Sequence, residues 1–360
     1  MAFIVILNAG VDWRLPEFWN LANAFLIIST KTNLIIDNAA IDVPFLSENG
    51  TVFRAFADFT TSNTSRASIT NWREPRKLPG FSLAEGARVR LGGASMEALP
   101  ADYHMHTPLC KHAEGAPEAY ARKALELGLP EIGFSDHSPL PRYHDDWRML
   151  NEEFPTYVRW IQEARSKVPE LPIRLGLEVD YFENGLDWIH QLSTRAHWDY
   201  LIGSVHYLGD WAMDDPSQVH RFRGRPVAEI WERYWALFGQ AARSGMFDIM
   251  AHPDLVKKFG HRPPGDLRSY YEPAIQAVVD AGVAIEINTA GLFKEVAEMY
   301  PAREFLEMAA QARVPLVISS DAHAPEHVGR EFAAAADLAR ACGFSRLCRF
   351  HERKRRQIAF

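Results

Sequence analysis

Six apolar runs in the second part of this chain end on a histidine, a glutamate or an aspartate. They end at His104-Met105-His106, Ser135-Asp136-His137, Gly176-Leu177-Glu178, Ser204-Val205-His206, Met250-Ala251-His252 and Ser320-Asp321-Ala322-His323. Because residues two apart share one face of a strand, His104 and His106 point the same way, as do Asp321 and His323. One such pair is more often two ordinary imidazoles, but the repetition indicates a shared metal site at the ends of strands.

The segments between these endings alternate between strand-like and helix-like patterns. The strand-like runs cover residues 101–106, 131–137, 173–181, 199–208, 247–252, 284–289 and 315–321. The helix-like segments cover residues 118–127, 151–168, 183–196, 227–243, 267–281, 302–313 and 326–341. This alternation predicts a parallel α/β barrel. Functional groups in such barrels gather at the carboxyl ends of the strands, where the ligand candidates fall.

Residues 1–95 differ from the rest of the chain. The stretch 60–65 is polar and loop-like, no sustained period links the apolar runs 25–28 and 34–36, and the segment contains no histidine. We therefore divide the chain into an irregular extension, 1–95, and a barrel, 96–360. Two accounts of the extension stay open, an added domain with a regulatory or binding role and a reading frame extended upstream of a natural start at Met96. We favour the second, because the barrel pattern is complete without the extension.

Composition excludes some classes of protein. A net charge of −7 argues against a general binder of polyanions, and the basic run 353–356 is short enough to be a solvated tail. Cys110, Cys342 and Cys348 form no disulfide framework and fit a reducing cytoplasm. No stretch reaches the roughly 20 apolar residues that a membrane helix needs. We expect a cytoplasmic protein that binds neither nucleic acid nor membrane, and the sequence leaves its oligomeric state open.

Seven stretches around the ligand candidates resemble one family. They are Asp102 to Pro108, Cys110 to Ala113, Gly133 to His137, Gly203 to His206, Ala251 to Asp254, Glu286 to Gly291 and Ser320 to His323. Through these stretches, residues 96–360 are similar to the polymerase and histidinol phosphatase (PHP) family, in its histidinol-phosphatase branch. The resemblance implies a distorted seven-stranded TIM-like barrel and a cluster of three divalent transition-metal ions, either zinc, iron or manganese.

The resemblance also implies which residues bind these ions. His104, His106, Glu178 and Asp321 would bind the first, Glu178 would bridge to a second held by His206 and His252, and His112, His137 and His323 would hold the third. Imidazoles suit these metals, and carboxylates offset charge and can bridge two ions. Cys110 is a less favoured ligand, because histidines and carboxylates already supply enough donors. Asp136 would either orient the imidazole of His137 or cap the start of a helix.

The family implies a metal-dependent phosphomonoesterase that hydrolyses L-histidinol phosphate to L-histidinol and phosphate in histidine biosynthesis. A hydroxide bridging two metals, held by Glu178 and the neighbouring ligands, would attack phosphorus. The sequence identifies no proton donor for the leaving group. Two alternatives stay open, a PHP phosphoesterase acting on nucleotide or sugar phosphates and a non-catalytic interaction module stabilised by metal. The presence of all the implied ligands argues against the second.

Candidate substrate contacts are basic side chains on loops that follow strands. They are Arg221, Arg223, Lys257, Lys258 and Lys294. Related phosphatases often carry an arginine directly after the Asn-Thr-Ala-Gly-Leu stretch; this chain has Phe293 there, and Lys294 would substitute. The amine of histidinol phosphate calls for an acid near the mouth of the site, and the candidates are Asp180, Glu183, Asp214 and Asp215. We expect Trp211 to pack in the core rather than to form a wall of the pocket.

Overall fold

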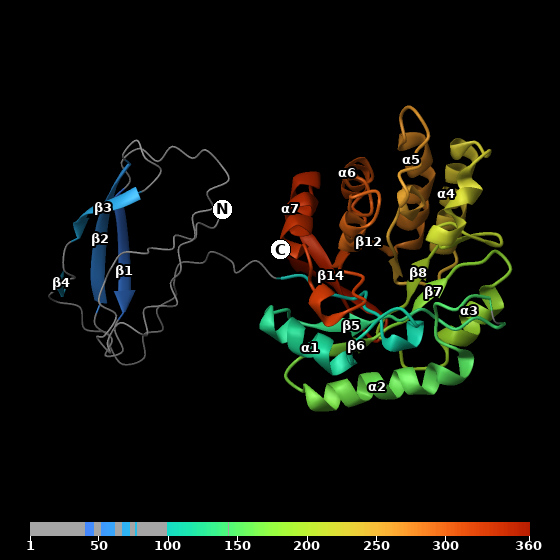
Figure 1. The fold of residues 1–360 in the computed structure, drawn as a ribbon, viewed down its shortest axis with the longest axis horizontal. Coiled ribbons are helices and arrows are strands. Elements are labelled where there is room, and N and C mark those ends of the chain that lie inside the picture. The colour runs from blue at the N-terminus through green and yellow to red at the C-terminus, as the bar shows by residue number, and fades with distance from the viewer. Residues whose placement is uncertain (1–39, 47–51, 62–66, 73–75, 78–98, 143) are drawn as a thin grey trace. The chain divides into compact units, whose positions relative to one another are not determined.

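The computed structural model describes residues 40–46, 52–61, 67–72, 76–77, 99–142 and 144–360 (Figure 1). The chain divides into two units, Met1–Gly93 and Ala94–Phe360. The first contains an antiparallel sheet in which β2 (Val52–Thr61) pairs with β1 (Ala40–Leu46), β3 (Ala67–Trp72) and β4 (Arg76–Lys77). The sequence indicates no strand period here, so this sheet is a difference from expectation. Met96 and the apolar runs 25–28 and 34–36 lie outside the described residues.

Parallel strands form the core of the second unit and confirm the predicted barrel. They are β5 (Ile132–Phe134), β6 (Ile173–Leu175), β7 (Glu178–Asp180), β8 (Ile202–Ser204), β11 (Ile249–Met250), β12 (Ala284–Asn288) and β13 (Leu316–Ser319). One sheet has the order β13-β12-β11-β8-β7, and β5 pairs with β6. Bridges from Asp102 to Ile132 and from Met105 to Ala322 join the first segment to its neighbours on both sides. The ring of strands is thereby closed.

The ring departs from a regular barrel in two places. The predicted first strand, 101–106, is joined only by isolated bridges, and the predicted run 173–181 is interrupted between β6 and β7. Gly176 lies at this interruption, and a Cβ there would come within 2.4 Å of the ring of Tyr200. The hydroxyl of Tyr200 donates to the carbonyl oxygen of Tyr103 at 2.6 Å. A large side chain inside the ring thus takes the space that a residue other than glycine would need.

Seven α-helices surround the strands, at the positions that the sequence predicts (Figure 1). They are α1 (Pro117–Glu126), α2 (Phe154–Lys167), α3 (Leu186–Ser193), α4 (Val227–Arg243), α5 (Arg268–Ala281), α6 (Arg303–Gln311) and α7 (Phe332–Cys342). Short 3-10 turns are η2 (Pro108–Cys110), η3 (Asn151–Glu153), η4 (Pro216–Phe222), η5 (Leu255–Lys257), η6 (Thr289–Phe293) and η7 (Pro325–His327). In the part of the chain that the structure describes, no helix has the length and apolarity required to cross a membrane.

Two antiparallel hairpins complete the second unit. One joins β9 (Tyr207–Leu208) to β10 (Trp211–Ala212), and the other joins β14 (Arg346–His351) to β15 (Lys354–Ala359). The basic run 353–356 belongs to the second hairpin and is not a tail, although Lys354, Arg355 and Arg356 are exposed to solvent as predicted. The hairpin is anchored because Phe350 is buried against the ring of Tyr103, with centroids 5.9 Å apart. The three cysteines are free, as predicted.

Candidate metal centre

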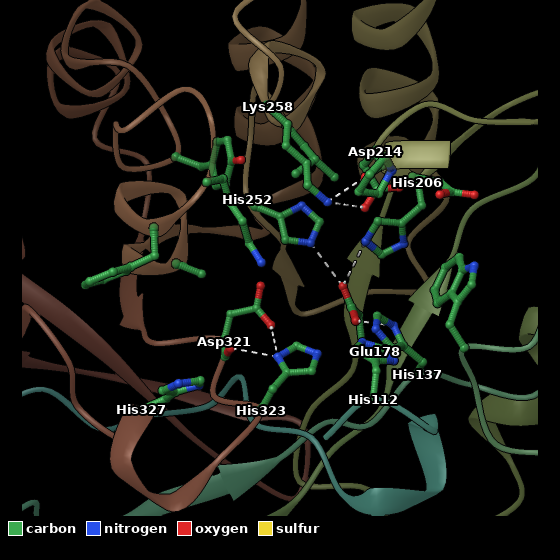
Figure 2. A pocket seen from close by; sticks show the side chains of 18 of the residues that line it. His112, His137, Glu178, His206, Asp214, His252, Lys258, Asp321, His323 and His327 are labelled. Carbon is green, nitrogen blue, oxygen red and sulfur yellow. Dashed lines mark hydrogen bonds and ion pairs between the residues drawn. The ribbon is translucent and has the colours of Figure 1, made fainter. Parts of the chain in front are cut away.

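The predicted metal ligands gather at the carboxyl ends of the strands, around one cavity (Figure 2). The cavity has a volume of about 820 Å³. Its lining includes the ligand candidates His112, His137, Glu178, His206, His252, Asp321 and His323. His104 and His106 are fully buried beside them. These side chains come together because most of them follow or begin a strand of the same ring, whereas His112 follows the turn η2.

Glu178 lies at the centre of the cluster, with its two oxygens facing different imidazoles (Figure 2). Oε1 is 3.1 Å from His252 Nε2 and 3.5 Å from His206 Nε2. Oε2 is 2.7 Å from His137 Nδ1 and 3.4 Å from His104 Nε2. A carboxylate in this position can bind one ion with each oxygen, which is the arrangement that a bridging ligand needs.

Asp321 and His323 form a second part of the cluster, next to the first histidine pair. Asp321 Oδ1 is 3.1 Å from His106 Nε2 and 3.8 Å from His104 Nε2. The ring of His323 stacks against those of His106 and His112, with centroids 4.1 and 4.6 Å apart. The exposed His112 thereby joins the group through His323 rather than through the buried carboxylates.

A second layer of carboxylates holds the imidazoles from behind. The distances from histidine Nδ1 to carboxylate oxygen are 2.9 Å for His104 and Glu286, 2.7 Å for His206 and Asp180, and 3.5 Å for His106 and Asp136. A carboxylate behind an imidazole fixes its tautomer and orientation, so that the other ring nitrogen faces the cavity. All three of these acids are fully or nearly fully buried.

Two of these supporting acids have roles that the sequence analysis did not assign. Asp136 accepts from the backbone N–H groups of His137 and Thr107, at 2.8 and 3.2 Å, and stands beside the imidazole of His106 rather than that of His137. Asp180, a candidate for the substrate amine, is instead buried against Arg148 at 2.6 Å. The position of Asp180 in the cluster could have been predicted from the sequence, because a residue two positions after Glu178 on a strand lies on the same face.

Glu286 was quoted only as part of a family motif, yet it contacts two ligand positions. It accepts from the backbone N–H of His252 at 2.8 Å as well as facing His104. His252 and Asp321 both have left-handed backbone, with φ of 23° and 52°. For a residue other than glycine this conformation costs about 1–3 kcal/mol and persists where the surroundings impose it. The bond from Glu286 is one such constraint.

The charges in the cluster shift the titration of its members. Burial would lower the pKa of His206, but the Asp180 and Glu178 carboxylates outweigh burial and raise it to about 9. Burial would likewise lower the pKa of His106, but Asp136 and Asp321 raise it to about 9. Burial would raise the pKa of Glu178, yet the facing imidazoles hold it well below its usual range. The carboxylates are therefore ionised and attract positive charge.

Several buried polar atoms of the cluster have no hydrogen bond, which is rare in folded proteins. Among the described residues they include His104 Nε2, His106 Nε2, His137 Nδ1, Glu178 Oε2 and His323 Nε2. His137 Nδ1 and Glu178 Oε2 are 2.7 Å apart but are not aligned for a hydrogen bond.

Donor atoms lie within 4.8 Å of one another in sets such as His104, His106 and Glu178; His104, His252 and Asp321; and His106, His137 and His323. Mixed imidazole and carboxylate donors suit transition metals. These residues therefore fit divalent metal ions. Cys110 also groups with His112 and His323, so its role as a further ligand stays open.

The predicted basic contacts divide into two groups. Lys258 and Lys294 line the cavity. Arg221, Arg223 and Lys257 are not among the lining residues. Arg221 instead pairs with Asp210 at 2.9 Å, and Arg223 is exposed. Lys257 is fully buried, where its Nζ donates to the carbonyl oxygen of Met299 at 2.8 Å.

The predicted acidic contacts divide in the same way. Asp214 and Asp215 line the cavity, whereas Glu183 pairs with Arg233. Trp211 is buried in the core, as predicted. Trp147, Phe293 and Tyr300 do line the cavity, and the sequence did not single out Trp147, because it lies on a loop without a regular period.

The comparisons with known proteins agree with this geometry. The family model for the PHP domain matches residues 102–290. A probable histidinol-phosphatase from Deinococcus radiodurans is 43% identical over 255 residues, which cover 70% of this chain and 97% of the relative. A histidinol-phosphatase from Bacillus subtilis is 30% identical, and the match covers 65% of this chain and 97% of that relative.

A solved structure shows the same fold. It is the crystal structure of a histidinol phosphate phosphatase from Lactococcus lactis complexed with zinc, L-histidinol and phosphate. The TM-score is 0.62 at 21% identity, and the match covers 71% of this chain and 98% of that one. The chain belongs to the PHP family, in its histidinol-phosphatase branch.

Proposed function

We propose that this protein hydrolyses L-histidinol phosphate to L-histidinol and phosphate in histidine biosynthesis. One observation carries the proposal. A chain with this cluster of imidazoles and carboxylates aligns with 97% of a probable histidinol-phosphatase at 43% identity. The Lactococcus lactis structure, which holds zinc, L-histidinol and phosphate, supports the same substrate and a metal centre.

We further propose three divalent ions, of zinc, iron or manganese, bound by nine residues. These are His104, His106, His112, His137, Glu178, His206, His252, Asp321 and His323. The two carboxylate oxygens of Glu178 face different imidazoles, which supports a role for Glu178 as the bridge between two ions. Such ions would supply Lewis acidity to the phosphoryl oxygens and lower the pKa of a nucleophilic water.

The protein's own residues would orient the reaction. Glu286 and Asp180 hold His104 and His206 so that Nε2 of each imidazole faces Glu178. This fixes the ligand set before substrate arrives, so little reorganisation is needed in the transition state. Asp180 is itself held by Arg148, which therefore supports the imidazole of His206 indirectly.

The mouth of the cavity suits the organic part of histidinol phosphate. Asp214 and Asp215 supply carboxylates for an ammonium group, and Asp214 already accepts from Lys258 Nζ at 3.1 Å. Trp147 presents an aromatic ring, stacked on Tyr207 at an interplanar angle of 10°, against which an imidazole can pack. An aryl phosphate would use neither carboxylate.

The test is a comparison of kcat/KM for L-histidinol phosphate and p-nitrophenyl phosphate on the metal-loaded full chain. We expect a ratio of roughly 100 or more in favour of histidinol phosphate, because a site with polar partners for one substrate rejects a ligand lacking them. Comparable rates would contradict the substrate. Faster turnover of a nucleotide or sugar phosphate would favour another PHP phosphoesterase, and metal binding without any turnover would favour a non-catalytic module.

We also propose that residues 96–360 are the catalytic unit and that residues 1–95 take no part in the reaction. The match of the PHP domain to residues 102–290 supports this division. Deleting residues 1–95 should change metal content and kcat/KM by less than about twofold, because the deletion removes no proposed metal ligand or substrate contact. A truncated protein that cannot fold or turn over substrate would show that the extension is an added domain the barrel needs.

A further inference from the structure

Three cations line the cavity, and they differ in what already holds them. Lys258 Nζ donates to the Asp214 carbonyl oxygen at 2.6 Å and faces its carboxylate at 3.1 Å. Lys294 is exposed at the rim. Arg330, which the sequence did not single out, is half-buried and forms no ion pair with any described residue. Its guanidinium is therefore not paired with a carboxylate of the described protein.

Arg330 is held by an aromatic ring instead. Its guanidinium carbon lies 3.5 Å from the centroid of the Phe293 ring. Phe293 is a large apolar side chain with 51% of its surface exposed. Its contact with the guanidinium of Arg330 explains why this ring lies at the surface. Stacking on a ring fixes the plane of a guanidinium while leaving its N–H groups at the edge available to a ligand.

The guanidinium of Arg330 has a nitrogen without a hydrogen-bond partner. Its Nε is buried and has no hydrogen-bond partner among the described residues. A buried donor without a partner costs free energy, so this Nε calls for a partner from outside the protein, either a ligand or a water molecule. The group is also close to the metal cluster, since Asp321 raises the pKa of Arg330 against the larger lowering effect of burial.

Charge around the cavity is distributed unevenly. Arg330 and Lys294 both act to lower the pKa of His327, after the larger effect of burial, so these two cations lie beside this imidazole and form one basic edge. Figure 2 shows His327 and Asp214 on opposite sides of the metal cluster. The acidic residues Asp214 and Asp215 and the basic edge therefore face different parts of a ligand.

We propose that Arg330, laid on the Phe293 ring, binds the phosphoryl oxygens of the substrate. This deepens the proposed function and depends on its premise that the cavity accepts phosphate monoesters. A planar guanidinium offers two parallel N–H donors, which match two oxygens of a phosphoryl group. Lys294 lacks this fork and is exposed, and Lys258 is already paired with Asp214.

The test measures binding of inorganic phosphate to the metal-loaded full chain by calorimetry, with metal content determined for each variant. Arg330→Ala should weaken phosphate binding about 10- to 100-fold, the usual range for losing charge-assisted hydrogen bonds. Arg330→Lys should recover only part of the loss, because it keeps the charge without the fork. Phe293→Leu should weaken binding by about threefold, through the lost stacking. Metal content should not change.

Arg195→Ala is the matched control. This arginine also lies over a phenylalanine, with its guanidinium carbon 4.3 Å from the Phe154 centroid, but it does not line the cavity. Its loss should leave phosphate affinity unchanged. If Arg330→Ala alters metal content, Arg330→Lys and Arg330→Gln decide at full metal loading.

Wild-type phosphate affinity in the metal-loaded Arg330 variants would overturn the proposal, as would a larger loss in Lys294→Ala than in Arg330→Ala. The outcome is separable from the proposed function. Dependence of phosphate binding on Arg330 in a protein that does not turn over L-histidinol phosphate would support the inference and refute that substrate.

Discussion

The two ends of the barrel both carry buried or half-buried carboxylates, but these face different partners. At the amino ends of strands, Glu131 pairs with Arg174 at 3.0 Å and Asp199 pairs with Arg165 at 2.9 Å. Asp248, just before β11, pairs with Arg353 of the C-terminal hairpin. Arginine is a permanent cation, so these carboxylates are neutralised within the protein.

At the carboxyl ends, Glu178 and Asp321 face imidazoles instead. In the described part of the chain, every ion pair of these two carboxylates is to a histidine. Imidazoles are metal ligands and, unlike the guanidinium of arginine, can give up their proton when a metal binds. A buried acid therefore stabilises the barrel where arginine pairs with it, and is available to a metal ion where histidines surround it.

The largest expected effect comes from removing one carboxylate at each end. Glu178→Gln should reduce kcat/KM about 100- to 1000-fold and lower metal content, because the substituted side chain loses the charge that both groups of imidazoles face. Glu131→Gln should keep its metal and its turnover, and lose about 1–3 kcal/mol of unfolding free energy through its weakened pair with Arg174. Metal analysis, kinetics and thermal unfolding of both variants measure this. Full metal content in Glu178→Gln would contradict the different roles proposed for the carboxylates at the two ends.

The second layer should give the next largest effect. Glu286→Gln and Asp180→Asn should each weaken metal affinity about 10- to 100-fold while leaving every proposed ligand in place, because the imidazoles lose their orienting carboxylates. Asp199→Asn, at the opposite end, should leave metal affinity unchanged. Competition with a chelating dye measures all three. Equal affinities across the set would show that the second-layer carboxylates do not position the ligands.

The pH dependence of metal binding tests whether the carboxylates raise the pKa of the imidazoles that they face. In the metal-free protein the pKa of His206 is raised to about 9, so a proton competes with the metal until the pH reaches that value. Apparent metal affinity should therefore keep rising as pH increases from about 6.5, the ordinary imidazole pKa, toward 9.

The same shift has an opposite effect on the stability of the metal-free fold. A raised histidine pKa stabilises the fold fully below the unfolded value and loses that effect as pH rises through the folded value. The thermal midpoint of metal-free protein should fall over this interval while metal affinity rises. A metal affinity that is constant above neutral pH would contradict the carboxylate and imidazole pairing.

The smallest expected effect lies at the mouth of the cavity. Asp214→Asn should lower kcat/KM for L-histidinol phosphate by roughly tenfold, because an ammonium group loses a charge-assisted partner. Turnover of p-nitrophenyl phosphate, which has no ammonium, should change by less than about twofold. An equal loss for both substrates would mean that Asp214 acts through Lys258 on the phosphate and not on the amine.

The floor of the site was predictable from sequence, whereas its rim was predictable only in part, through Lys258, Lys294, Asp214 and Asp215. His104, Glu178, His206 and Asp321 lie at strand ends, where alternation along the chain fixes which way a side chain points. Arg330 and Trp147 stand on loops, whose conformation depends on packing against distant segments, as Arg330 depends on Phe293. Side-chain type alone could not separate the buried Lys257 from its neighbour Lys258 in the cavity.

The fold shows the same division. The helices were placed by their apolar period, and α4 has the predicted bounds of Val227–Arg243. The hairpin of β14 and β15 was missed, because the basic run 353–356 dominates its local pattern. What holds it is long-range, through the burial of Phe350 and the pairing of Arg353 with Asp248.

We propose that one shared cluster binds the ions that give activity, and the number of ions bound per chain tests this proposal. Metal-depleted full chain is titrated with zinc, and bound ions per chain are measured alongside turnover of L-histidinol phosphate. The account predicts that activity reaches its maximum at three ions per chain and that Glu178→Gln binds fewer. Full activity at a single ion, or in the metal-depleted protein, would contradict it.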